Sequence, residues 1–114
     1  MAMTSRKYAP GEAIFTQGEH GHEAYIIRKG SVAILHRDAS GNEAAIAFRG
    51  PGEMVGEMAL ATRERRMATV RAESACTVAV LTRDEIEDRM TDADPILQVV
   101  LQTAFARLRE LVPR

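Results

Sequence analysis

The sequence predicts a mainly β domain that ends in helices. Short β-rich runs separated by glycine turns occupy the chain from Tyr8 to Leu81, and this spacing is typical of a β-sandwich or a β-barrel-like roll. From Thr82 onward the apolar residues recur at helical spacing instead. The chain has 114 residues, which is enough for one domain with its own core.

The composition excludes several classes of protein. A hydrophobic content of 46% argues against disorder, and a formal net charge of -1 gives no basic field for nucleic acid. No apolar run approaches the ~20 residues of a membrane-spanning helix, and no secretory signal opens the chain. One cysteine, Cys76, cannot form an internal disulfide. We therefore expect a cytoplasmic domain that contacts neither nucleic acid nor membrane.

The first β-rich runs are separated by hairpin signals. Lys29-Gly30 divides one run over Ala24–Ile27 from another over Ser31–His36, and a Ser-Gly-Asn turn at 40–42 precedes a further strand. A basic-glycine or Ser-Gly-Asn break between apolar runs is typical of a hairpin. We therefore expect antiparallel pairing between consecutive strands in this half of the chain.

The second half of the β region contains a loop and a final strand. The stretch "RGPGEMVGE" is a loop because of its glycines and proline. Strand character resumes at 67–82, with alternation at Cys76, Val78 and Val80. Cys76 is therefore expected to be a buried, inert core residue.

Two helices are predicted after the strands. Thr82 followed three residues later by Glu85 is a capping box, which predicts a short helix from Arg83. Asp94-Pro95 then matches an N-cap followed by proline at the first helical position. The second helix is expected to reach about residue 110 and to place an apolar stripe on the core. The stripe consists of Ile96, Leu97, Val100, Leu101, Ala104, Phe105 and Leu108.

These elements define the expected organisation of the chain. Residues 1–7 are predicted to be an N-terminal extension and residues 8–110 one domain, with the β-roll over 8–82 and the helices over 83–110. Residues 111–114, "LVPR", match the remnant of a thrombin-cleaved expression tag. The terminal helix can pack either on the roll or on a second copy of the chain, so a homodimer stays open.

One group of residues, between positions 56 and 69, is a candidate ligand-binding site. The stretch "GEMAL" at 56–60 and the stretch "RMAT" at 66–69 flank a charged loop. Gly56 and Ala59 are small and let the backbone approach a ligand, while a helical turn there would direct free N–H groups at an anion. Arg66 can donate a bidentate fork to phosphate, and Glu57 can accept from a hydroxyl. A nucleotide or sugar phosphate satisfies both, although an ion pair between Glu57 and Arg66 stays open.

This group of residues resembles the phosphate-binding cassette of cyclic nucleotide-binding domains. The upstream stretches "PGE" at 10–12, "QGE" at 17–19, "YII" at 25–27 and "KGSV" at 29–32 also resemble the family. The resemblance implies an eight-stranded antiparallel, jelly-roll-like β-roll with a short cassette helix and two C-terminal helices. It also implies that Glu57 binds the ribose 2′-hydroxyl and that Arg66 binds the cyclic phosphate. Backbone N–H groups near Ala59 and Met67 would complete the phosphate site.

The resemblance further implies a non-catalytic sensor with no metal and no cofactor. It implies cyclic AMP in preference to cyclic GMP, because Met67 stands where a Thr or Ser accompanies cyclic GMP preference. The signal would pass through the C-terminal helix to an effector domain or partner protein. In two departures from the family, Arg65 stands in place of a frequent proline and Val55 in place of a frequent phenylalanine. The expected ligand-site residues are Ile46, Val55, Gly56, Glu57, Met58, Ala59, Arg66, Met67, Ala68, Thr69 and Arg107.

Two alternatives remain at this point. Cupins share a β-roll of this kind, and His20, His22 and Glu23 approach their metal-binding motif, with His36 as a further histidine. Glu23 follows His22 too closely for that motif, however, and His36 lies outside a matching second motif. The other alternative is the ligand-sensing part of a transcription regulator, which needs a helix-turn-helix after the long helix.

Overall fold

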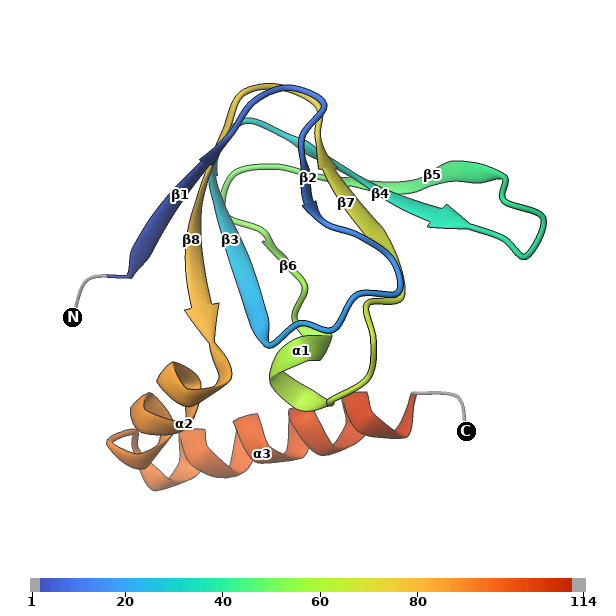
Figure 1. Ribbon diagram of the computed structural model, residues 1–114. Helices are drawn as coiled ribbons and strands as arrows, with labels where there is room; N and C mark the ends of the chain where they lie inside the picture. Colours follow the sequence, from blue (N-terminus) through green and yellow to red (C-terminus); the bar gives the residue numbers. More distant parts are fainter. Residues whose placement is uncertain (1–2, 112–114) are drawn as a thin grey trace.

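The computed structural model describes residues 3–111 and shows two antiparallel sheets with helices gathered at one end (Figure 1). Residues 112–114 of the predicted tag remnant lie outside the described part. The first sheet has the strand order β1-β8-β3-β6 and the second β2-β7-β4-β5, which confirms the predicted fold class. The strands are β1 (Thr4–Tyr8), β2 (Ala13–Phe15), β3 (Glu23–Lys29), β4 (Val32–Arg37), β5 (Glu43–Arg49), β6 (Met54–Val55), β7 (Thr69–Ala72) and β8 (Cys76–Thr82). The helices are α1 (Met58–Ala61), α2 (Arg83–Thr91) and α3 (Pro95–Glu110).

Strand β8 is buried on both of its faces. The alternation at Cys76, Val78 and Val80 places these side chains in the main core cluster, as predicted. Burial also raises the pKa of the Cys76 thiol, which keeps it protonated and unreactive. The next residue, Leu81, points to the opposite face of β8 and packs with Leu60 of α1, the cassette helix, in a second cluster. The same strand therefore supports both the roll and the helices that close it.

The roll begins earlier than the sequence predicted. Residues 4–7 were assigned to an extension, but they form most of β1, which pairs antiparallel with β8 from Thr4↔Val80 to Tyr8↔Cys76. The segment "TSRKY" is mostly exposed at the edge of its sheet. An exposed edge strand carries no apolar alternation, so hydrophobic periodicity cannot detect it.

Both predicted helix starts are confirmed. The Thr82 hydroxyl accepts a hydrogen bond from the backbone N–H of Glu85 at 3.2 Å, and α2 begins at the next residue, Arg83. The Asp94 carboxylate accepts from the backbone N–H of Ile96 at 2.8 Å, and α3 begins at Pro95. These side chains satisfy donors that a helix start leaves without intrahelical partners.

The predicted packing of the α3 stripe is wrong for the first half of the helix. Ile96 is 77% exposed, and Leu97 and Val100 are also exposed. Phe105, farther along, packs against the cluster that contains Leu60. Figure 1 shows α3 passing beneath α1, so the contact with the rest of the domain lies toward its C-terminal half. Within residues 3–111, no helix combines the length and apolarity needed to cross a membrane.

A hydrogen-bonded group at the start of β3 links this strand to the edge strand β1 across β8. The Glu23 carboxylate accepts from both terminal nitrogens of Arg6, at 3.3 Å each, and from the Tyr25 hydroxyl at 3.0 Å. Burial raises the pKa of Glu23, but the bonds from Arg6 and Tyr25 outweigh it and leave the pKa below its ordinary value of 4.5. Burial and the bond to Glu23 raise the pKa of Tyr25 to about 12.

The lowered pKa of Glu23 predicts a pH-dependent contribution to stability. A carboxyl whose pKa is lower in the folded state stabilises the fold above pH 4.5, its ordinary pKa, and loses this contribution as the pH falls through the lowered value. Thermal unfolding of wild type and Glu23→Gln should therefore differ most near neutral pH and converge in acid. The control is Glu53→Gln, whose ion pair with Arg49 is more exposed and should matter little. A difference in thermal midpoint between wild type and Glu23→Gln that persists unchanged in strong acid would contradict this account.

Candidate ligand-binding site

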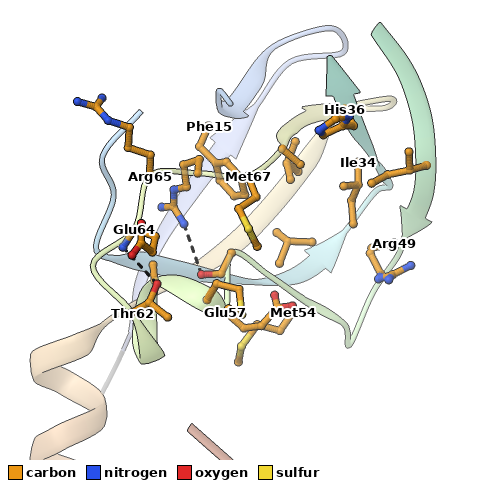
Figure 2. A pocket seen from close by; sticks show the side chains of 18 residues that line it. Phe15, Ile34, His36, Arg49, Met54, Glu57, Thr62, Glu64, Arg65 and Met67 are labelled. Carbon is orange, nitrogen blue, oxygen red and sulfur yellow. Dashed lines mark hydrogen bonds between the residues drawn. The ribbon is translucent and has the colours of Figure 1, made fainter. Parts of the chain in front are cut away.

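A cavity of about 460 Å³ lies between the α1 segment and strands β4 and β5. Figure 2 shows the labelled side chains around it, with Phe15 and Met67 on one side and Glu57 and Met54 on the other. Nine of the eleven predicted site residues line this single cavity. They are Ile46, Val55, Gly56, Glu57, Met58, Ala59, Arg66, Met67 and Ala68.

Two predicted site residues do not line the cavity. Thr69 is buried, and its hydroxyl accepts from the backbone N–H of Gln17 at 2.9 Å. Arg107 is exposed on α3, which contributes no residue to the cavity wall. The structure also adds wall residues that the sequence reasoning missed, among them Phe15 and Ile34. These come from strands far away in sequence, and no local motif marks them.

Arg66 is the central side chain of the site. Although only 9% of it is exposed, it lines the cavity. Its Nη2 donates to the Glu23 carbonyl at 2.8 Å and its Nη1 to the Gly56 carbonyl at 3.4 Å. Its guanidinium carbon lies 4.1 Å from the centroid of the Phe15 ring, a cation–π contact. Its Nε–H finds no acceptor among the described residues.

Among the described residues, no carboxylate forms an ion pair with this buried cation, although the more distant Glu19 and Glu23 carboxylates act to raise its pKa. The ion pairs found within residues 3–111 join other arginines to other carboxylates, and Arg66 is in none of them. The predicted alternative of a Glu57–Arg66 ion pair is therefore not formed. Burial lowers the pKa of Arg66, which is the electrostatic sign of a charge removed from water. A buried cation without a countercharge is unfavourable, and an anionic ligand would supply both the charge and the missing acceptor.

Backbone geometry places Arg66 at this position. The backbone N–H of Gly18 donates to the Arg66 carbonyl and that of Arg66 to the Glu19 carbonyl, both at 2.8 Å. Gly56 has a positive φ of 75°, which disfavours other residues. A Cβ on Gly56 would also lie 3.0 Å from Arg66 Nη1 and 3.1 Å from the Phe15 ring. The cassette glycine is therefore required both for the turn and for the space that the guanidinium occupies.

Glu57 provides a second polar group on the cavity wall. It is exposed at the start of α1, and its carboxylate makes no side-chain cap bond and no ion pair within the described residues. It is thus available to accept from a ligand hydroxyl. Ile46 and Met67 line the same cavity and remain exposed. These apolar side chains can cover the flat face of a base without supplying hydrogen bonds.

The described part of the chain offers no set of metal ligands for the cupin-like alternative. Across residues 3–111, no group of three or more His, Cys, Asp or Glu side chains converges so that it could hold a metal ion. The histidines that suggested a metal therefore do not form a centre in the described part of the chain. The cavity instead combines the buried Arg66 cation, the exposed carboxylates of Glu57 and Glu64 and an apolar surface, which together suit an anionic ligand with a hydroxyl and a planar group.

Comparison with known proteins agrees with this class of site. The sequence matches the family described as "Cyclic nucleotide-binding domain" over residues 5–92, and the chain belongs to this family. It is 32% identical over 102 residues to the cAMP-activated global transcriptional regulator CRP of Salmonella typhimurium, covering 89% of this chain and 48% of that protein. The chain thus spans about half the length of the curated relatives it matches.

Solved structures show the same fold. The halfsite-occupied form of the EAL enzyme Bd1971 matches with a TM-score of 0.87 and 34% identity, covering 96% of this chain and 97% of that chain. Bd1971 has also been solved in cAMP-bound and cGMP-bound forms. The catabolite activator protein of Thermus thermophilus matches with a TM-score of 0.80 and 29% identity, over 95% of this chain and 51% of that chain.

Substitution of Arg66 should greatly weaken ligand binding. A hydrogen bond to a charged group contributes roughly 1.5–3 kcal/mol, so two such bonds correspond to about 100-fold or more in Kd at ~1.4 kcal/mol per tenfold. Calorimetry with cyclic AMP should show this loss for Arg66→Ala and a partial recovery for Arg66→Lys, which lacks the fork.

Arg65 provides the matched control for this experiment. Arg65 also lines the cavity, but its guanidinium points away from it (Figure 2) and donates to the Gly18 carbonyl at 2.9 Å. Arg65→Ala should therefore retain most of the affinity. A folded Arg66→Ala variant that binds like wild type would mean that the phosphate lies elsewhere.

Proposed function

We propose that this chain is a non-catalytic regulatory domain that binds a cyclic nucleotide monophosphate in the cavity around Arg66. Arg66 binds the cyclic phosphate, Glu57 accepts from the ribose 2′-hydroxyl, and Ile46 and Met67 cover the base. The observation that carries the proposal is the buried Arg66 guanidinium, whose Nε–H finds no acceptor and which forms no ion pair within residues 3–111. The similar CRP protein of Salmonella typhimurium is a cAMP-activated transcriptional regulator, which supports the same ligand class.

We further propose that cyclic AMP is preferred over cyclic GMP. Met67, directly after the cassette arginine, lines the cavity and carries no hydrogen-bond donor. A guanine 2-amino group buried beside it would lose its water partners, at a cost of about 1–3 kcal/mol. Thr69 could in principle replace the missing hydroxyl, but it is buried away from the cavity wall, and its oxygen already accepts from Gln17. Adenine has no group at that ring position and avoids the cost.

Competition binding with both nucleotides tests the ligand and the preference together. Wild type should bind cyclic AMP more tightly than cyclic GMP, and Met67→Thr should improve cyclic GMP binding relative to cyclic AMP, by up to about tenfold for one new hydrogen bond. Met67→Leu is the matched control, because it keeps an apolar side chain and adds no hydroxyl. Tighter binding of cyclic GMP by wild type would refute the preference. No relative gain in Met67→Thr would refute its mechanism.

We also propose that the signal leaves the site through the C-terminal helices. Two arginines from these helices bind the C-terminal end of the cassette helix α1. Arg83 Nη2 donates to the Ala59 carbonyl at 2.5 Å and also to the Thr62 carbonyl, and Arg109 Nη1 donates to the Ala61 carbonyl at 3.2 Å. These are carbonyls that a helix end leaves without intrahelical partners. Any shift of α1 on ligand binding therefore acts directly on α2 and α3.

The apolar start of α3 is a surface through which this movement could reach a partner. Its exposed residues are Ile96, Leu97, Val99 and Val100. A second copy of the chain and an effector segment are both compatible with such a surface, as the sequence indicated. Ligand binding would change the population of a pre-existing α3 position rather than create a new one.

Hydrogen exchange can test the link between α1 and α3. In wild type, cyclic AMP should alter the exchange of α3 amides, because Arg109 connects that helix to the cassette. Arg109→Ala should reduce this effect by removing the bond to Ala61. Arg107→Ala is the matched control: Arg107 lies two residues earlier on the same helix, is exposed and does not line the cavity. An undiminished response in Arg109→Ala would show that coupling does not depend on this contact.

A further inference from the structure

The loop between β2 and β3, residues 16–22, contacts the cassette at Arg65 and Arg66. Reciprocal backbone bonds join Gly18 and Glu19 to Arg66, as described above. The Gln17 backbone N–H donates to Thr69, and the Arg65 guanidinium donates to the Gly18 carbonyl. This loop, here called the β2–β3 loop, is therefore attached to the cassette arginines along several residues.

Gly21, near the end of the β2–β3 loop, lies directly beside the Arg66 guanidinium. A Cβ built on Gly21 would lie 2.4 Å from Arg66 Nε, 2.4 Å from Nη2 and 2.5 Å from Cζ. These are the three nearest atoms, and all belong to Arg66. Such distances are far inside van der Waals contact, so any side chain at this position would displace the guanidinium. The φ of Gly21 is not positive, so the requirement for glycine arises from space and not from backbone conformation.

We propose that Gly21 is a positioning residue for ligand binding, because its missing side chain leaves the space in which the Arg66 guanidinium is held. Gly21 sets one boundary of that space and Phe15 another, while the Glu23 and Gly56 carbonyls hold Nη2 and Nη1. The guanidinium is thus in place before a ligand arrives. Pre-organised donors avoid the ordering cost that a free arginine would incur on binding.

This inference rests on the proposed role of Arg66 toward the phosphate. A side chain at residue 21 would push the guanidinium away from both carbonyls that now hold it. The displaced cation would then have to be reordered against that side chain each time a ligand binds. Gly21 therefore acts on the ligand through Arg66 and does not touch the ligand itself.

A double-mutant cycle between residues 21 and 66 tests the proposal. Gly21→Ala should lower the thermal midpoint by several degrees and weaken cyclic AMP binding about tenfold or more, because overpacking displaces the guanidinium. In an Arg66→Ala background, Gly21→Ala should change the thermal midpoint and the Kd little, because the atoms that the new Cβ would meet are absent. Gly50→Ala is the matched control: a Cβ on Gly50 meets nothing within 4 Å and its φ is not positive. It should change neither quantity.

The two readouts separate failure of the inference from failure of the proposed function. An equal loss of thermal midpoint from Gly21→Ala with and without Arg66 would overturn the inference, and so would an unchanged Kd in Gly21→Ala. If Arg66→Ala binds like wild type, the proposed function fails and the positioning role with it, even where the stability coupling is observed. If Gly21→Ala does not fold, the double variant Gly21→Ala/Arg66→Ala should fold, and failure of both would contradict the proposal.

Discussion

The structure of the site depends on one buried cation, Arg66, that forms no ion pair within the described residues. Two backbone carbonyls, an aromatic face and two glycines surround the Arg66 guanidinium, and no carboxylate of the described residues forms an ion pair with it. These neighbours are neutral, so they hold the group in position without neutralising it. An acidic neighbour would stabilise the free protein better, but it would compete with an anionic ligand. This arrangement costs stability, because the buried charge is not paired, but it leaves Arg66 free to pair with an anion such as the phosphate of the proposed ligand.

The rest of the domain holds this cation in place and connects its site to the C-terminal helices. Strand β3 supplies the Glu23 carbonyl that accepts from Arg66, and the Glu23 carboxylate accepts from Arg6 and from the Tyr25 hydroxyl. The short helix α1 has the cavity at its start and the arginines of α2 and α3 at its end. The binding site and the C-terminal helices are therefore joined by a single turn of helix, over a path of a few hydrogen bonds.

Local sequence signals predicted the parts of this arrangement that depend on local chemistry. The cassette around Glu57 and Arg66 and the caps at Thr82 and Asp94 were recognisable because each involves residues close together in the chain. Phe15 and Gly21 were not, because they meet Arg66 through strand pairing and loop docking that no nearby residue indicates. Edge strand β1 was missed because it is exposed and carries no apolar alternation. The exposed start of α3 was missed because an apolar stripe marks a face that can be buried, but not what it packs against.

The central claim is that the Arg66 guanidinium is the anion-binding group. The most direct measurement is the NMR spectrum of arginine Nε–H groups in protein labelled with ¹⁵N, with the Arg66 resonance assigned by its absence in Arg66→Ala. Addition of cyclic AMP should shift this resonance and slow its exchange with water, whereas adenosine, which lacks the phosphate, should leave it nearly unchanged. An Arg66 resonance that responds equally to adenosine, or that does not respond to cyclic AMP at saturation, would contradict the account.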